Sequence, residues 1–497
     1  MMRENQNQTA KKLIHDFFTK KSFYWDIVQT RRLLNQFHFA ANNVPAYRDF
    51  LKIHGINSKK IKSLGDFQLV PFTTKANYLK RYPLNWLVPN SLNYETKIFT
   101  SSSGSTGEPF YFPRTEQLDW QSSVYHEIFL KNLHLPSTSP TLIVIAFGMG
   151  VWIGGLITFR AFQILNSRLN LPLSIITPGT NKSEILYALK YLAPQYKQTV
   201  LAGYPPFIKD ILDQAKREKI NFSKLKLKLL FAAETFTENF RNHVANLGKI
   251  DNPISATANI YGTADLGTTS IETPLSVSIR RLAAKSGKIH SILFPEAHKL
   301  PTLTQYIPNF INFEEFAGEL LLTGNSAVPL IRYAIGDKGG VISYNKIRQI
   351  LLESDAAKNI LSTANASQAP FVYVYERTNF AAKLHLRDIY PQVIREALLF
   401  GSICKQLTGK FTMSTKYDHN HEQYLEVNLE KKPNGKISYQ LNKIIYGRIL
   451  NAILTKTEGP GNPKELQNKK LLKLIFWPYE HPLYFKIGIK QQWNINR

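Results

Sequence analysis

Apolar runs and helical periodicities alternate through the middle of the chain. Leu142–Ile145 is entirely apolar, and Leu227–Ala233 is apolar except for Lys228, a pattern typical of strands that are buried on both faces. Helical patterns follow such runs, and Thr237 is placed to cap a helix that ends near Gly248. This alternation predicts an α/β fold with a parallel sheet, in which ligands bind at the carboxyl ends of the strands.

The two ends of the chain follow other patterns. Residues 10–95 read mostly as helix with a proline turn at 42–48, and the last part of the chain mixes strands with a helix at 439–454. We therefore expect a large α/β core with a β-rich subdomain that begins at Glu319, and a small C-terminal α+β domain. The expected boundaries are 1–95 for an N-terminal helical layer, 96–375 for the core and 376–497 for the C-terminal domain.

One uncharged stretch, Thr141–Phe159, has nearly the length of a membrane span. Glycines at Gly148, Gly150, Gly154 and Gly155 interrupt it, so we interpret it as a buried strand, a turn and the start of a helix. Further along, Ser183 is expected to cap the next helix.

The charge and the cysteine content limit the classes of function that the chain can have. The chain has 497 residues, 62 of them basic and 36 acidic, which gives a formal net charge of +26. The lysines are scattered and no nucleic-acid-binding motif stands out, so we favour a solvated lysine-rich surface over a dedicated polyanion site. Cys404 is the single cysteine, which excludes an internal disulfide and indicates a reduced, buried thiol. With no apolar signal segment at the start, we expect a cytoplasmic protein without a specific nucleic-acid partner, and membrane association has no supporting feature.

The segment Thr100–Pro109 carries the most chemistry. It reads Thr-Ser-Ser-Ser-Gly-Ser-Thr-Gly-Glu-Pro, with six hydroxyls and two glycines. Backbone N–H groups next to glycine and side-chain hydroxyls together suit phosphate oxygens. The alternative is a low-complexity linker, but apolar residues at Lys97–Phe99 and Phe110–Phe112 favour a loop held between two strands.

Three later segments place an acidic residue at the end of a predicted strand or turn. Residues 261–265 read Tyr-Gly-Thr-Ala-Asp, residues 332–337 read Arg-Tyr-Ala-Ile-Gly-Asp, and Glu234 follows the apolar run that ends at Ala233. Each of these is also compatible with an ordinary turn. Their order along the chain, after the hydroxyl-rich loop, favours a functional interpretation over ordinary turns.

Taken together, these segments resemble the signatures of the acyl-adenylate-forming enzymes, and within them of phenylacetate–CoA ligases and related capsule-biosynthesis adenylation proteins. The loop of that family reads roughly Ser-Ser-Gly-Thr-Thr-Gly-Lys-Pro. Ser102–Pro109 matches it with Ser105 for the first threonine and Glu108 for the lysine. The Asn-Val-Pro-Ala-Tyr-Arg turn at 43–48 and the Arg377 segment also resemble the family, whose fold is a large α/β core with a small mobile lid.

The resemblance implies a role for each matched position. Asp265 would hold Mg²⁺, Asp337 the ribose hydroxyls, and Arg377 the ribose or a phosphate. A lid lysine would reach the acyl phosphate; Lys490 is favoured and Lys486 comes next, whereas Lys436 lies in an Asn-Gly turn. The remaining nucleotide-binding positions would be Ser102, Ser103, Gly104, Ser105, Thr106 and Gly107 at the phosphates, and Glu234, Tyr261 and Gly262 at the adenine.

The implied reaction joins a small carboxylic acid to AMP, with ATP and Mg²⁺ as cofactors and CoA as the acceptor by default. Transfer of the acyl group to a carrier protein or an amine is the second hypothesis, because no sequence feature fixes the acceptor. A nucleotide-binding protein that has lost catalysis is the third, which the departures at Glu108, Asp265 and Asn379 favour slightly.

Overall fold

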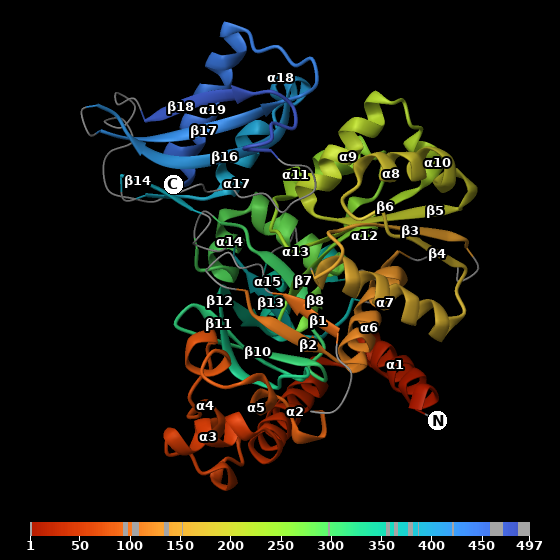
Figure 1. Cartoon of the computed structure of the whole chain (residues 1–497), viewed down its shortest axis with the longest axis vertical. Helices are drawn as coiled ribbons and strands as arrows, with labels where there is room; N and C mark the ends of the chain where they lie inside the picture. Colours follow the sequence, from red (N-terminus) through yellow and green to blue (C-terminus); the bar gives the residue numbers. More distant parts are fainter. Residues whose placement is uncertain are drawn as a thin grey trace.

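A computed structural model gives the arrangement of the chain (Figure 1). The residues that it describes are 2–92, 98–101, 109–133, 139–151, 153–296, 299–353, 358–361, 366–375, 381–385, 387–419, 422–457 and 471–485.

A single large sheet forms the centre of the described structure. Strands β4, β3, β5, β6 and β7 are parallel, whereas β8 and the strands beyond it pair antiparallel. The strand order is β10 (Ile311–Phe316), β11 (Glu319–Gly324), β12 (Leu330–Ile342), β13 (Phe371–Val374), β9 (Thr302–Gln305), β8 (Gly267–Ile271), β7 (Thr257–Thr263), β6 (Leu227–Ala232), β5 (Gln198–Gly203), β3 (Thr141–Ala146) and β4 (Leu173–Ile176). The α/β class predicted from the alternation of patterns is confirmed.

Helices cover both faces of the parallel part, which explains why its strands are rich in apolar residues. In β3, Ile143 and Ile145 face the cluster formed with α1 (Met2–Thr19), α6 (Glu116–Asn132) and α7 (Ile153–Leu169). Leu142 and Val144 point to the opposite face. That face is covered by α8 (Lys182–Tyr187), α9 (Pro205–Arg217), α10 (Phe222–Leu225) and α11 (Glu238–Leu247). Burial of each such side chain contributes about 2 kcal/mol before the entropy cost of folding.

The N-terminal helices pack against the antiparallel end of the sheet, at the bottom of Figure 1. Pro45 stands at the first position of its helix, where it lacks no hydrogen bond, and so divides two helices as the proline pattern predicted. Phe37 and Phe67 join Phe313 of β10 in one buried cluster. The helices are α2 (Ser22–Asn43), α3 (Pro45–Ile53), α4 (Leu64–Gln68) and α5 (Leu84–Leu87).

The remaining helices of the core are short or lie at the back of the sheet. Leu275 and Ile279 pack with Ile347 and Phe371 in a separate buried cluster. These helices are α12 (Pro253–Ala256), α13 (Pro274–Lys285), α14 (Gly287–Leu293), α15 (Tyr344–Leu352) and α16 (Lys358–Leu361).

A β-hairpin flanks the hydroxyl-rich segment. Strands β1 (Ile98–Ser101) and β2 (Tyr111–Arg114) are antiparallel, with Ser101 opposite Tyr111 and Thr100 opposite Phe112. The expectation that two strands hold the loop is confirmed for its flanks. Residues 102–108 themselves lie outside the described part.

The C-terminal unit, residues 381–485, has its own sheet and its own buried cluster, and it sits at the end of the molecule opposite α2–α5 (Figure 1). Apolar side chains of α19 such as Ile445 and Ile449 pack on Val427 and Leu429 of the sheet. Its elements are β14 (Ala382–Leu384), β15 (Arg387–Ile389), α17 (Pro391–Leu398), α18 (Gly401–Gln406), β16 (Leu407–Tyr417), β17 (Gln423–Lys431), α19 (Tyr439–Lys456) and β18 (Leu472–Trp477).

Helix capping separates a confirmed prediction from a wrong one. The Thr237 hydroxyl accepts from the N–H of Phe240 at 3.2 Å, as the sequence predicted. Ser183 does not cap α8, because that helix begins one residue earlier and the Asn181 side chain accepts from Glu184 N–H at 3.2 Å. Asparagine and serine are equally good caps, so the pattern alone did not distinguish the two positions.

The uncharged 141–159 stretch forms β3, a turn and the start of α7, as predicted. Among the described residues no helix combines the length and the apolar character that crossing a membrane requires.

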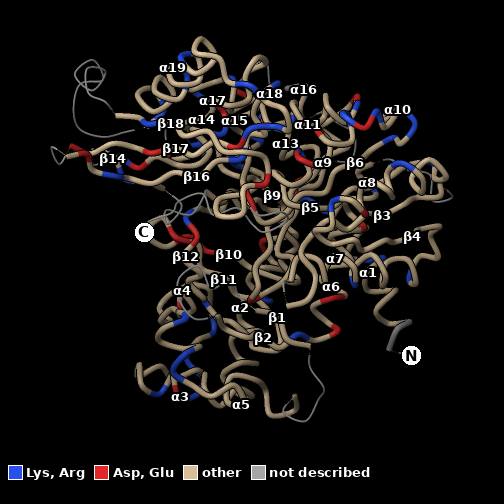
Figure 2. The backbone as a smooth tube through the Cα atoms, turned by 45° about the horizontal axis from the view of Figure 1, so that its top comes forward, with Lys and Arg blue, Asp and Glu red and all other residues tan. Residues whose placement is uncertain are grey.

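Cys404 is a half-buried free thiol whose pKa is raised by burial. Figure 2 shows lysine and arginine spread along many elements of the chain rather than confined to one of them.

Candidate active site

Acidic and aromatic side chains meet at the carboxyl ends of the parallel strands. Tyr204 directly follows β5, Glu234 lies two residues beyond β6, and Asp265 lies two residues beyond β7. Because β5, β6 and β7 are parallel neighbours, these three positions share one edge of the sheet.

Two reciprocal hydrogen bonds join the two sequence signatures. The Tyr261 hydroxyl donates to Asp337 Oδ2 at 2.7 Å, and the Tyr333 hydroxyl donates to Asp265 Oδ1 at 3.1 Å. The tyrosine of each signature thus bonds to the aspartate of the other. Strands β13, β9 and β8 lie between β7 and β12 in the sheet order, so this contact crosses the edge rather than following the ladder.

Glycines shape both signatures. A side chain at Gly262 would place its Cβ 2.9 Å from the carbonyl oxygen of Gly267, so only glycine fits where β7 turns into β8. Gly336 has a φ of +82°, a conformation that other residues avoid. The β11–β12 ladder is irregular here, since Ala334 pairs with Leu321 and Lys338 with Glu319. This bulge takes Asp337 out of the regular ladder and lets it meet Tyr261.

Arg332, the first residue of its signature, anchors the N-terminal layer to the site. It lies in the left-handed region at φ +46°, and its guanidinium is 3.3 Å from Glu314. It also donates to the carbonyl oxygens of Gln68, at 2.5 Å, and Val70. Burial raises the pKa of Glu314, and the charge of Arg332 partly offsets that rise. Thr73 donates its N–H to the Arg332 carbonyl oxygen, and its own carbonyl oxygen accepts the N–H of Ala334. Together with the side-chain contacts of Arg332, these backbone bonds hold β12 against the N-terminal layer.

The segment that carries Glu234 is held by hydrogen bonds that three side chains donate to its consecutive carbonyl oxygens. Asn259 Nδ2 donates to the oxygen of Glu234 at 3.1 Å, and Arg280 donates to that of Phe236 at 2.6 Å. Between them, Arg395 from the C-terminal unit donates to the oxygen of Thr235 at 2.8 Å. We name residues 234–236 the adenine-side segment, after the role expected from the sequence. Its entry is tight, because Ala233 has a φ of +73°.

Tyr204 lies at the carboxyl end of β5, next to the adenine-side segment that follows β6. Its ring meets Phe147 edge-on at 5.0 Å between centroids. Burial raises the pKa of Tyr204, the Glu234 carboxylate raises it further, and a hydrogen bond with the Gly148 backbone opposes both effects. Ser101, at the end of β1, donates its N–H to the Val151 oxygen of the same turn at 3.0 Å. The hydroxyl-rich loop therefore starts beside this edge.

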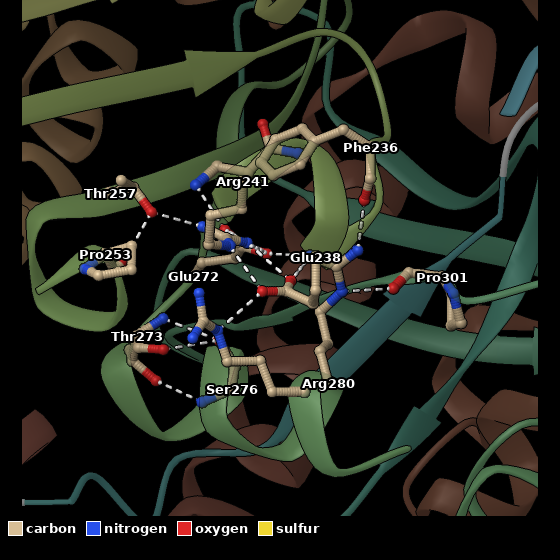
Figure 3. A network of polar contacts seen from close by, with 12 residues as sticks. Phe236, Glu238, Arg241, Pro253, Thr257, Glu272, Thr273, Ser276, Arg280 and Pro301 are labelled. Carbon is tan, nitrogen blue, oxygen red and sulfur yellow. Dashed lines mark hydrogen bonds and ion pairs between the residues drawn. The ribbon is translucent and has the colours of Figure 1, made fainter. Parts of the chain in front are cut away.

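A buried cluster of two arginines and two glutamates lies between α11, α13 and the end of β8 (Figure 3). Arg241 and Arg280 each bond to Glu238 and Glu272, at distances of 2.8–3.2 Å, and both arginines are fully buried. Glu272 Oε2 also accepts the N–H of Asn259 at 2.8 Å. Since Asn259 holds the adenine-side segment, the cluster fixes β7 and that segment together.

The structure brings five of the predicted site residues to this edge, namely Glu234, Tyr261, Gly262, Asp265 and Asp337. The predicted residues Ser102, Ser103, Gly104, Ser105, Thr106, Gly107, Arg377, Lys486 and Lys490 lie outside the described residues. Within the described part, no group of three or more His, Cys, Asp or Glu side chains is arranged to hold a metal ion.

Sequence reasoning missed Tyr333 and Arg395. Tyr333 stood inside a recognised signature, so equal attention to its tyrosine would have found it. Arg395 gave no signal, because its contact depends on how the C-terminal unit docks on the core.

The α/β core with its smaller C-terminal unit is the fold of several solved acyl-activating ligases. The chain superposes on 2-hydroxyisobutyryl-CoA ligase in its postadenylation state with a TM-score of 0.66 at 15% identity, covering 95% of this chain and 89% of that one. The same ligase in its thioesterification state gives a TM-score of 0.50. An acyl acid amido synthetase in complex with 2,4-DB gives 0.58 at 13% identity, covering 95% and 90% of the two chains.

The sequence is similar to curated phenylacetate-coenzyme A ligases. It is 26% identical to the protein of Aromatoleum evansii over 316 residues, which are 62% of this chain and 65% of that one. It is 25% identical to the Thermus thermophilus protein over 243 residues, or 48% and 50% of the two chains. The match thus spans less than two thirds of these relatives. No protein-family model matches the chain. On fold and sequence together, the chain is similar to enzymes of the acyl-adenylate-forming superfamily.

Proposed function

We propose that the protein activates a small carboxylic acid with ATP, forming an acyl-AMP and releasing pyrophosphate. The observation that carries this proposal is the reciprocal pair of bonds between Tyr261 and Asp337 and between Tyr333 and Asp265. Two carboxylates from distant parts of the chain converge at the strand edge where α/β folds bind ligands. The similarity to phenylacetate-coenzyme A ligases supports the same reading.

Each predicted site residue that lies in the described part has a role in the proposal. Asp337 accepts the two ribose hydroxyls, and Tyr261 and Glu234 flank the adenine. Asp265 supplies an oxygen ligand to Mg²⁺, which neutralises charge on the triphosphate when bound. Gly262 admits the nucleotide close to the backbone.

The reacting centre involves residues outside the described part. The carboxylate oxygen of the substrate attacks the α-phosphorus, and the bond to the bridging oxygen of pyrophosphate breaks. Residues 102–107 would hold the leaving phosphates, Arg377 the ribose or a phosphate, and Lys490 or Lys486 the charge that develops on the α-phosphate.

The acceptor of the acyl group is CoA in our proposal, in line with the curated relatives. The same fold serves a 2-hydroxyisobutyryl-CoA ligase and an acyl acid amido synthetase, with 95% of this chain covered in each comparison. Fold alone therefore leaves an amine or a carrier protein as the second candidate. A location in the cytoplasm is part of the same proposal, because ATP and CoA are supplied there.

The test is pyrophosphate release from MgATP with a panel of aryl and fatty acids. We expect release with at least one acid, followed by thioester formation when CoA is added. Release without a thioester, but with amide formation from an amine, would favour the second candidate. Nucleotide binding without release for any acid would contradict the proposal and favour a protein that has lost catalysis.

A further inference from the structure

Among the described residues, charged side chains join the C-terminal unit to the core on α9 and at the candidate site. The first contact lies on α9, where Asp210 is 2.9 Å from Lys182 and 3.1 Å from Lys410 of the C-terminal unit. Asp213, one turn further, is 2.8 Å from Lys432 of the C-terminal unit. Burial would raise the pKa of both aspartates, but the lysines outweigh it and both pKa values lie below the ordinary range.

The second contact falls on the candidate site. Arg395 lies in α17, and its side chain and that of Glu234 are each only 6% exposed. One guanidinium nitrogen donates to the Thr235 oxygen at 2.8 Å, and the other is 3.6 Å from Glu234 Oε2. A residue of the C-terminal unit thus holds both the backbone and the charge of the adenine-side segment.

This contact exists in one docking of the C-terminal unit. If that unit rotates away, α17 moves with it and Arg395 leaves Glu234. Over the whole chain, the structure superposes better on the postadenylation state of 2-hydroxyisobutyryl-CoA ligase than on its thioesterification state, with TM-scores of 0.66 and 0.50. Any nucleotide that prefers one arrangement of the segment must therefore bias the docking, and the docking must bias nucleotide affinity by the same factor.

We propose that Arg395 is a positioning residue that couples the docking of the C-terminal unit to nucleotide binding, through the carbonyl of Thr235 and the carboxylate of Glu234. The inference rests on the proposed function for the identity of the ligand. Its geometry stands on the described residues alone. The α9 contact holds the C-terminal unit in place without touching the adenine-side segment, and so provides the natural control.

The first experiment measures ATP-dependent pyrophosphate exchange in Arg395→Met and in the matched control Lys432→Met. Loss of one hydrogen bond and one ion pair made by the guanidinium should raise the KM for ATP about tenfold in Arg395→Met, with kcat changed less than about threefold. Lys432→Met also breaks an interdomain ion pair, but the Lys410–Asp210 and Lys182–Glu480 pairs still hold the C-terminal unit on the core. The unit therefore stays docked, and we expect the KM for ATP to stay within about twofold of wild type. Arg395→Lys keeps the charge without the forked geometry and should fall between the two.

A purely structural role predicts a different result. If the interface only needs its ion pairs, Lys432→Met and Arg395→Met will raise the KM alike. That outcome, or an unchanged KM in Arg395→Met, would overturn the inference.

The second experiment measures docking directly and needs no turnover. Spin labels at Tyr187→Cys on α8 and Tyr439→Cys on α19, in a Cys404→Ser background, report the distance between the core and the C-terminal unit. Both sites are well exposed, at 63% and 83%. We expect a narrow distance distribution in the parent protein and a broadened one in Arg395→Met that MgATP does not restore. An identical distribution in the two proteins would contradict the coupling.

The two experiments separate the inference from the proposed function. Absence of exchange in the wild type with every acid would overturn the proposed function, and nucleotide coupling with it. Exchange in the wild type together with unaltered KM and distances in Arg395→Met would overturn the inference alone.

Discussion

Two groups of buried carboxylates find their hydrogen-bond partners in different ways. Glu238 and Glu272 are bound by two fully buried arginines (Figure 3), so this cluster carries its countercharge within the core. Asp265 and Asp337 accept hydrogen bonds from neutral tyrosine hydroxyls. A carboxylate has about four acceptor positions, and a hydroxyl uses one of them without cancelling the charge.

The difference separates scaffold from site. The arginine–glutamate cluster fixes β7, α11 and α13 to one another and leaves no role for an outside ligand. The tyrosine–aspartate pairs orient two carboxylates where the two sequence signatures converge, and carboxylate oxygens suit hydroxyl groups and a metal ion. Stability should therefore depend on the first group, and activity on the second.

The largest expected effect on stability comes from Arg280→Met. It leaves Glu238 and Glu272 in the core with one arginine fewer, and breaking a buried ion network in this way costs about 3–5 kcal/mol. Urea denaturation measures the loss. The matched control is Arg281→Met, because Arg281 also contacts Glu238, at 3.1 Å, but is 24% exposed and should cost less than about 1 kcal/mol. Equal losses in the two variants would contradict the distinction.

A smaller effect, on activity rather than folding, is expected for Tyr333→Phe. Removing one hydroxyl leaves the ring in place but takes away one of the contacts that orient Asp265, so kcat/KM for ATP should fall about tenfold while stability changes by about 1 kcal/mol. Tyr306→Phe is the control, since its buried hydroxyl has no hydrogen-bond partner among the described residues. Full activity in Tyr333→Phe, with activity lost in the control, would refute the role of the reciprocal pair.

A third expected effect is on the pH dependence of stability and concerns a buried histidine. Burial lowers the pKa of His126 to about 4, and a hydrogen bond to the Ser122 oxygen at 2.7 Å opposes this. Its neutral form is favoured by folding, so the contribution is complete above the ordinary pKa of 6.5 and is lost as the pH falls towards 4. The free energy of unfolding should decrease by up to about 3 kcal/mol over that range.

His126→Leu should flatten this part of the stability profile, measured by chemical denaturation at several pH values. An unchanged slope would mean that His126 does not titrate there. His243, whose pKa is also lowered to about 4, is expected to supply the remaining slope.

Periodicity explains how much of the fold was accessible from sequence. The apolar runs at β3 and β6 and the Thr237 cap are local signals, and each appears where it was predicted. The choice between Asn181 and Ser183 failed because two good caps stand close together. Flanking apolar residues sufficed to place the β1–β2 hairpin.

The site was accessible only in part, for a physical reason. Glu234, Tyr261, Asp265 and Asp337 could be chosen one by one from their motifs. The bond between Tyr333 and Asp265 joins residues 68 apart in the chain and depends on how the sheet curves. Arg395 is 160 residues from Thr235, and only the docking of two units brings them together.

The most direct test of the account is a calorimetric titration of MgATP into the wild type, Asp337→Asn and Asp337→Ala. The account predicts measurable affinity in the wild type and a loss of at least about 100-fold in Asp337→Ala, because two hydrogen bonds from ribose to a charged acceptor disappear. The variant should remain folded and form no acyl-AMP, with Asp337→Asn in between. Equal affinity in the wild type and Asp337→Ala would contradict the assignment of this edge as the nucleotide site.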